Sequence, residues 1–270
     1  MDSRPIGVFD SGVGGLTIVR ALIDLMPNES ITYFGDTARY PYGPRARDDV
    51  RRFALEIATW LAEQDVKMLI AACNSASSAG LDHVRSALPG VPMVEVVEPA
   101  VRAAVRATRN RRIGVIGTQL TIRSGAYQRA VQATRENVVL IQQACPRFVE
   151  FVERGETAGP EVIELARDYL APLRAEDVDT LILGCTHYPL LSGVLKFVMR
   201  DAVLISSAEE TAEDAYAELT RRSMFRTADS QPQHRFVSSG DAAMFLALGS
   251  RFLGPEITEV EQPAPRAAGR

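Results

Sequence analysis

The sequence predicts an α/β protein with two similar α/β domains, each containing a mainly parallel sheet. Three observations lead to this fold class. Short apolar runs of strand type alternate with helical stretches, which is typical of βαβ units. Several runs recur in the same order at offsets of about 110 positions, which indicates an internal repeat. Two recurring runs end in cysteines, Cys73 and Cys185, at strand ends that open onto a ligand crevice in such sheets.

The first half reads as strands and helices in strict alternation, with turn residues between them. We expect strands at 6–10, 31–35, 66–72 and 93–97, with helices at 16–26, at 47–64 and ending near residue 88. A glycine-rich loop, Ser11 to Gly15, follows the first strand. The dipeptides Pro27-Asn28 and Pro89-Gly90 end their helices.

The second half repeats this plan. We expect strands at 113–118, 178–184 and 202–206, which echo those at 6–10, 66–72 and 93–97. We then expect a helix at about 209–222, a loop at 227–232, a strand at 235–238, a helix at 241–252 and a frayed tail at 254–270. The ordered set of echoes predicts two related domains with pseudo-twofold symmetry and an active site in the cleft between them.

The composition limits the classes of function. The chain has 270 residues, 46% hydrophobic and 24% charged, which is ordinary for a soluble globular protein. A net charge of −4 does not suggest nucleic-acid binding, and no apolar run reaches membrane-spanning length. An odd number of cysteines without a secretion signal indicates reduced thiols and a cytoplasmic location. Neither lysine, Lys67 or Lys196, is placed for a Schiff base with pyridoxal phosphate.

The two cysteines suggest an acid–base reaction at carbon. Each thiol is expected to face a helix N-terminus, which favours the thiolate. Cys73 on one wall of a crevice and Cys185 on the other would suit racemisation, in which one face of a carbon loses a proton and the other gains one. The reference pKa of a thiol, about 8.5, puts both protonation states within reach.

Polar residues near the same strand ends are candidate helpers. Asp10 ends the first strand, and His187 follows Cys185 by two positions, as in known Cys–His pairs. The residues expected to bind a carboxylate, with backbone N–H groups, are Ser11, Asn74, Ser75, Thr118 and Thr186. Tyr42-Gly43 would close one wall. Each of these residues also has a plainer interpretation as a cap, a turn or a structural side chain.

Other functional classes remain open at this point. Gly12-Val13-Gly14 and Asp36 suggest a dinucleotide site, but Thr17 occupies the third glycine position. A redox enzyme would usually carry Cys-x-x-Cys, which the sequence lacks. A zinc site built from the two cysteines and His187 lacks the usual close ligand spacing. A binding module with two buried core cysteines is the remaining alternative.

The motifs resemble those of bacterial glutamate racemases, in the aspartate/glutamate racemase superfamily. The segments that carry the resemblance are 10–15, 41–43, 72–76, 144–146, 184–189, 239–241 and 249–254. They occur in the family's order from about residue 6 to residue 254. Ser75 stands where the family more often has threonine, and the hydroxyl is retained.

The resemblance implies an activity and a set of site residues. It implies a racemase without cofactor or metal that interconverts L- and D-glutamate and supplies D-glutamate for peptidoglycan synthesis in the bacterial cytoplasm. Cys73 would deprotonate D-glutamate and Cys185 would deprotonate L-glutamate. The supporting residues would be Asp10, His187 and Glu153, with Glu150 one helical turn away. The implied substrate contacts are Asp10, Ser11, Tyr42, Gly43, Asn74, Ser75, Thr186 and His187.

The resemblance also implies domain bounds and partners. Residues 1–97 and 207–254 would form the N-terminal domain, residues 98–206 the second domain, and residues 255–270 a flexible tail. A homodimer is expected, without membrane or direct nucleic-acid binding, and Cys145 is expected to be structural. Inhibition of DNA gyrase is linked to some family members, and the sequence does not test it. The alternatives are a sister racemase or isomerase that uses the same two thiols on aspartate or another small acid, and a regulatory protein that acts on a partner such as gyrase.

Overall fold

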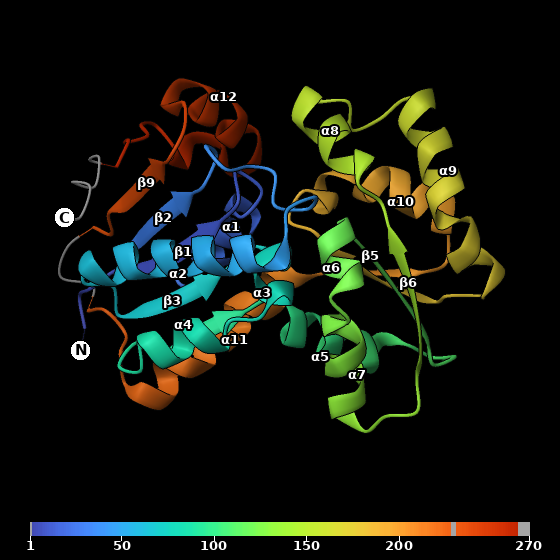
Figure 1. Cartoon of the computed structure of the whole chain (residues 1–270), viewed down its shortest axis with the longest axis horizontal. Helices are drawn as coiled ribbons and strands as arrows, with labels where there is room; N and C mark the ends of the chain where they lie inside the picture. Colours follow the sequence, from blue (N-terminus) through green and yellow to red (C-terminus); the bar gives the residue numbers. More distant parts are fainter. Residues whose placement is uncertain (1, 228–230, 264–270) are drawn as a thin grey trace.

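The computed structural model describes residues 2–227 and 231–263. The chain forms two lobes that lie side by side, and each lobe contains a parallel sheet with helices on both faces (Figure 1). The first and the last residues that the structure describes both lie in the first lobe (Figure 1). Within the described residues, no helix is long and apolar enough to cross a membrane.

The elements are named in chain order. The strands are β1 (Ile6–Asp10), β2 (Ile31–Gly35), β3 (Met68–Ala71), β4 (Met93–Glu95), β5 (Arg112–Gly117), β6 (Val139–Ala144), β7 (Thr180–Gly184), β8 (Val203–Ser206) and β9 (His234–Ser238). The first-half helices are α1 (Leu16–Leu25), α2 (Arg47–Glu63), α3 (Asn74–Ala79), α4 (Asp82–Ala87) and α5 (Val97–Ala107). The remaining α-helices are α6 (Gln119–Arg123), α7 (Ala126–Thr134), α8 (Arg147–Arg154), α9 (Pro160–Ala175), α10 (Ser192–Met199), α11 (Ser207–Arg222) and α12 (Ala242–Leu253). Two short 3₁₀-helices are η1 (Tyr188–Leu191) and η2 (Gly254–Glu256).

The two sheets repeat the same strand order. The first sheet runs β4-β3-β1-β2-β9, and the second runs β8-β7-β5-β6. Every strand pairing in the two sheets is parallel. β5 therefore takes the place of β1, and β7 the place of β3, as the sequence repeat predicts. This arrangement confirms the expected fold class of two similar α/β units.

Helices on both faces explain why the strands are almost continuously apolar. In β1, Ile6 and Val8 point into a core shared with α1 and α11, whereas Phe9 points into a core shared with α2. In the second lobe, Leu181 and Leu183 of β7 pack with α9 and α10 while Ile182 packs with α5 and α7. A strand buried on both faces has no solvent side on which polar residues are favoured.

Two expectations on local structure were wrong. The helix expected to end near residue 88 is two helices, because Gly80 has a φ of +96°, in the region that favours glycine and interrupts a right-handed helix. The expected frayed tail is ordered in its described part. Ile257 is buried in the first core, and Glu261 bridges Val237 of β9. The rest of that tail, 264–270, and residues 228–230 of the expected loop lie outside the described residues.

The chain passes between the lobes through α5 and α11, which pack against each other. Arg102 of α5 forms an ion pair of 2.5 Å with Asp214 of α11, and Arg106 forms one of 2.7 Å with Glu210. These exposed pairs are worth little energy individually. They join the two connecting helices. The lobes are therefore linked by two packed helices rather than by two separate loops.

A buried ion pair holds the start of β3. The Lys67 Nζ lies 2.5 Å from Glu29 Oε2, and both side chains are almost fully buried. Lys67 also donates to the carbonyl oxygens of Asp2 and Met224 at 3.0 and 2.8 Å. The ammonium group thus connects the chain start, the α1–β2 loop and the segment after α11. It lies at the opposite end of β3 from Cys73.

We predict that Lys67→Met strongly destabilises the protein. The substitution leaves the Glu29 carboxylate buried without its counter-charge, which costs about 3–5 kcal/mol. Urea unfolding of wild type and variant measures the loss. Adding Glu29→Gln should recover part of it, because a neutral amide is less costly to bury. Lys196→Met is the control, since this exposed lysine donates, among the described residues, to the Ala202 carbonyl alone. A loss below about 1 kcal/mol for Lys67→Met would contradict the ion-pair argument.

Candidate active site

A cavity of about 430 Å³ opens between the lobes at the carboxyl ends of their strands. Residues from both lobes line it. Those named in the sequence analysis are Ser11, Tyr42, Gly43, Cys73, Asn74, Ser75, Thr118, Glu150, Glu153, Cys185, Thr186 and His187. Asp10 is buried and does not line the cavity. The structure thus brings every predicted site residue except Asp10 to the wall of one cavity.

Cys73 follows β3 and begins the short helix α3. Burial raises the pKa of its thiol, and the charge of Asp10 raises it further, while hydrogen bonds from Ala76 and Ser11 act in the opposite direction. The net shift is upward. The expected thiolate is therefore wrong for this cysteine, because desolvation outweighs the helix N-terminus. Cys73 holds its proton at neutral pH.

Cys185 follows β7 in a different setting. The next element is the 3₁₀-helix η1, and α10 begins only at Ser192, so no α-helix N-terminus adjoins this thiol. Its neighbour is the buried imidazole of His187. Burial lowers the pKa of His187, but contacts with Cys185 and Glu153 raise it more, to about 10. His187 therefore carries a positive charge beside Cys185 at neutral pH.

Glu153 provides the carboxylate for this histidine. It lies on α8, and its Oε1 is 3.5 Å from His187 Nε2. Burial raises the pKa of Glu153, yet contacts with His187 and Tyr40 lower it to below the usual value. Glu150 also lines the cavity one turn earlier, but the ion pair with His187 is made by Glu153.

The loop after β1 brings the lobes into close contact. The Oδ2 of Asp10 accepts from the Gly15 N–H at 2.8 Å and lies 3.5 Å from Thr186 Oγ1. A Cβ at Gly14 would lie 2.3 Å from Thr186 Oγ1 and 2.6 Å from His187 Nδ1. Only glycine fits there, because any side chain would push Thr186 and His187 away.

Several buried polar atoms around the cavity have no hydrogen-bond partner among the described residues. They are Asp10 Oδ1, Tyr40 OH, Asn74 Nδ2 and His187 Nε2. Asn74 is held by its other amide atom, which accepts from Tyr127 of the second lobe at 2.7 Å. Unsatisfied buried groups are costly, so their concentration at one cavity marks it as a site built to bind a polar molecule.

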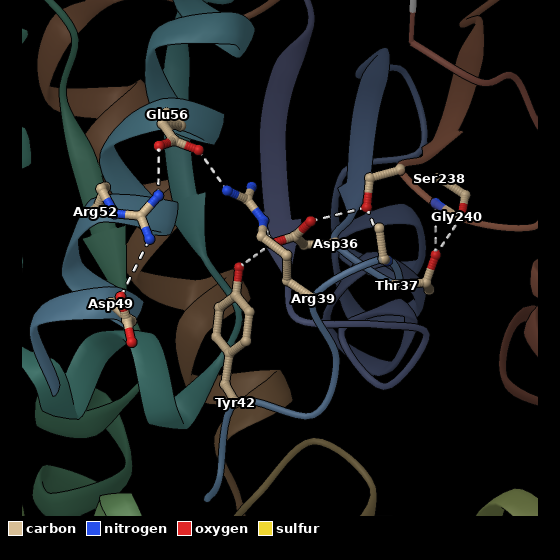
Figure 2. A network of polar contacts seen from close by, with 11 residues as sticks. Asp36, Thr37, Arg39, Tyr42, Asp49, Arg52, Glu56, Ser238 and Gly240 are labelled. Carbon is tan, nitrogen blue, oxygen red and sulfur yellow. Dashed lines mark hydrogen bonds and ion pairs between the residues drawn. The ribbon is translucent and has the colours of Figure 1, made fainter. Parts of the chain in front are cut away.

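The wall formed by residues 36–44 is held from behind. Asp36, at the end of β2, accepts from the Tyr42 hydroxyl, from Arg39 at 2.7 Å and from Ser239 at 2.8 Å (Figure 2). Thr37 shares a hydrogen bond of 2.6 Å with Ser238. Because both oxygens of Asp36 are engaged, it is not available as the ribose ligand of a dinucleotide site.

Sequence reasoning did not identify some lining residues. Tyr40, Gln119, Pro146 and Val149 also face the cavity. No local pattern marks them, since their position depends on how the two lobes meet. Within the described residues, no group of three His, Cys, Asp or Glu side chains is arranged to hold a metal ion.

Comparisons with known proteins agree with this architecture. A family model described as Asp/Glu/Hydantoin racemase matches residues 16–215. The chain is 55% identical to a glutamate racemase of Parafrankia sp., covering 100% of this chain and 98% of the relative. It is 54% identical to the glutamate racemase of Beutenbergia cavernae, covering 96% and 93%.

Solved structures show the same similarity. The glutamate racemase of Francisella tularensis, in complex with D-glutamate, superposes with a TM-score of 0.92 at 36% identity, covering 98% of each chain. That of Thermus thermophilus gives 0.88 at 43% identity, covering 98% and 99%. The match spans nearly the whole chain and confirms the resemblance carried by the sequence motifs. The chain therefore belongs to the Asp/Glu/hydantoin racemase family and is an enzyme of the isomerase class.

Proposed function

We propose that this protein interconverts L- and D-glutamate without a cofactor, by proton transfer to and from Cys73 and Cys185. The observation that carries the proposal is that cysteines from opposite lobes line a single cavity. The similarity to glutamate racemases, one of them in complex with D-glutamate, supports glutamate as the substrate.

Each cysteine serves one face of the α-carbon. From L- to D-glutamate, the Cys185 thiolate takes the α-proton and becomes a thiol. The Cys73 thiol donates its proton to the opposite face of the carbanion and becomes a thiolate. The reverse direction exchanges these roles. The positive charge on His187 lies beside Cys185, and the raised pKa of Cys73 means that its thiol is protonated and has a proton to donate.

Polar groups around the cysteines would hold the substrate. Asn74 offers an unpartnered amide N–H, and the hydroxyls of Ser75 and Thr118 share a hydrogen bond of 2.9 Å at the cavity wall. These donors suit a carboxylate. Ser11, Tyr42, Gly43 and Thr186 complete the proposed contacts. We also propose Asp10 as a substrate contact on the family resemblance; its Oδ1 is buried without a partner among the described residues, although the side chain does not line the cavity in this structure.

The proposed product and assembly follow the family resemblance. D-glutamate would supply peptidoglycan synthesis in the bacterial cytoplasm, and the protein would act as a homodimer. We propose domain bounds of 1–97 with 207–254, and 98–206. The pairing of β9 with β2 supports assigning the later segment to the first domain.

The decisive test of the substrate is a direct assay. Purified protein is incubated with L-glutamate or L-aspartate, without added cofactor, and the D-enantiomers are separated by chiral chromatography. Formation of D-glutamate with little D-aspartate supports the proposal. Preferential formation of D-aspartate would reassign the substrate and keep the two-cysteine mechanism.

We predict that Cys73→Ala and Cys185→Ala each lower the racemisation rate by at least about 10³-fold, because each removes an obligatory acid or base. Cys145→Ala is the matched control, since its thiol contacts the Gln143 carbonyl and does not line the cavity. Full turnover in either of the first two variants would exclude the mechanism.

The assignment of faces has its own test. In D₂O, Cys73→Ser should lower the rate of deuterium exchange at the α-carbon more for D-glutamate than for L-glutamate. Cys185→Ser should lower the rate more for L-glutamate. The measurement is α-proton loss by NMR, starting from each pure enantiomer. Equal loss for both enantiomers in one variant would leave the assignment unsupported.

We predict an alkaline limb in the pH profile that belongs to His187. Its raised pKa of about 10 means that the imidazole is protonated below that value and loses its charge above it. The ratio kcat/KM should therefore fall as the pH rises through about 10. His187→Asn should lower activity and remove this limb. A limb that persists unchanged in the variant would assign it to another group.

A further inference from the structure

Tyr40 lines the same cavity as the Glu153–His187 pair, and its ring lies near that of His187. It belongs to the loop after β2 in the first lobe, whereas Glu153 lies on α8 of the second. The Tyr40 hydroxyl is buried, and its interaction with the Glu153 carboxylate lowers the pKa of that group. The contact does not reach full hydrogen-bond geometry, and the ion pair between Glu153 and His187 is also long, at 3.5 Å.

The ring of Tyr40 is seated from several directions. Its ring atoms would lie 3.1 Å from a Cβ at Gly12, so the missing side chain there makes room for it. The ring centroid lies 6.1 Å from that of His187. On either side of it in the loop, Arg39 and Tyr42 are both tied to Asp36 (Figure 2). The position of the Tyr40 ring is therefore set by packing against it and by the anchoring of its neighbours in the loop.

The protonation states define which group donates. Burial and the charge of Glu153 raise the pKa of Tyr40 far above its usual value, so the phenol keeps its proton throughout the working pH range. Glu153, with its lowered pKa, is a carboxylate and accepts. Hydrogen bonds in active sites often tighten only in the complex with substrate.

We propose that Tyr40 is a positioning residue of the racemisation reaction, whose hydroxyl donates to Glu153 across the cleft and thereby fixes this carboxylate against His187. The proposal rests on the proposed function and adds a residue that does not itself contact the reacting atoms. Its consequence is that the charged partner of Cys185 is correctly placed only when the two lobes are together.

The pKa of Glu153 can report on Tyr40, because Tyr40→Phe changes one of its neighbours and leaves the other charged groups unchanged. The titratable and charged groups that surround it are His187, Cys185, Tyr40, Glu150 on its own helix, and Arg251 of α12, which donates to the Glu153 carbonyl oxygen at 3.3 Å. Tyr40→Phe removes one hydroxyl and leaves the others in place. Without that donor the carboxylate is less stabilised, so its pKa must rise.

The experiment compares Tyr40→Phe with wild type on glutamate. We expect kcat to fall about tenfold with little change in KM. We also expect the acidic limb of the kcat profile, which the proposal assigns to protonation of Glu153, to move up by about one pH unit. Tyr216→Phe, which removes a hydroxyl from the half-exposed face of α11 outside the cavity, is the control and should leave both unchanged. An unmoved acidic limb in Tyr40→Phe overturns the proposal, even if kcat falls.

A double-mutant cycle separates positioning from a general structural effect. If Tyr40 acts through Glu153, then Tyr40→Phe combined with Glu153→Gln should be no slower than Glu153→Gln alone. Fully additive losses would overturn the proposal. Thermal unfolding of all variants checks the fold. Glutamate racemisation by wild type and by Tyr216→Phe tests the proposed function independently. If neither wild type nor Tyr216→Phe racemises glutamate, the proposed function and the role of Tyr40 are both contradicted. If both of these proteins racemise glutamate, the result for Tyr40→Phe tests the role of Tyr40 alone.

Discussion

The close approach of the two lobes at Gly14 is the constraint on which the site depends. With no side chain at this position, the loop after β1 presses against Thr186 and His187, and the carboxyl ends of both sheets share one cavity. Asp10, anchored by the Gly15 N–H, reaches Thr186 of the other lobe for the same reason. A wider separation would leave two half-sites with one thiol each, whereas the proposed mechanism needs both thiols at one carbon.

The two halves share a strand order but not an electrostatic environment. Cys73 has a carboxylate nearby and is desolvated, so its proton is held tightly. Cys185 has a protonated imidazole, held in turn by Glu153. A repeated fold thus places equivalent sulfur atoms, and a few unlike neighbours give them unlike electrostatic surroundings. This asymmetry suits a reaction whose two substrates are mirror images but whose protein is built only from L-residues.

Much of this architecture could be predicted from local pattern. Apolar runs, their order and their repetition predict both sheets, and residues at strand ends must gather where parallel strands point. The protonation of Cys73 could not be predicted, because burial is a property of the assembled lobes. Tyr40 carries no local signal for its place in the cavity near Glu153 and His187, because that place depends on how the two lobes meet. The break at Gly80 and the burial of Ile257 also depend on three-dimensional context that spacing along the chain does not contain.

The segment around Glu261 packs along β9 and covers part of the edge of the first sheet. β9 is an edge strand, and the unpaired N–H and C=O groups of an edge strand can pair with another chain. Backbone hydrogen bonds of Glu261 with Phe236 and Ser238, together with its ion pair to Arg235, occupy part of that edge. The segment therefore reduces the part of β9 that is open to pairing with a second chain. Removing the chain from residue 261 onward would expose unpaired backbone N–H and C=O groups at this edge.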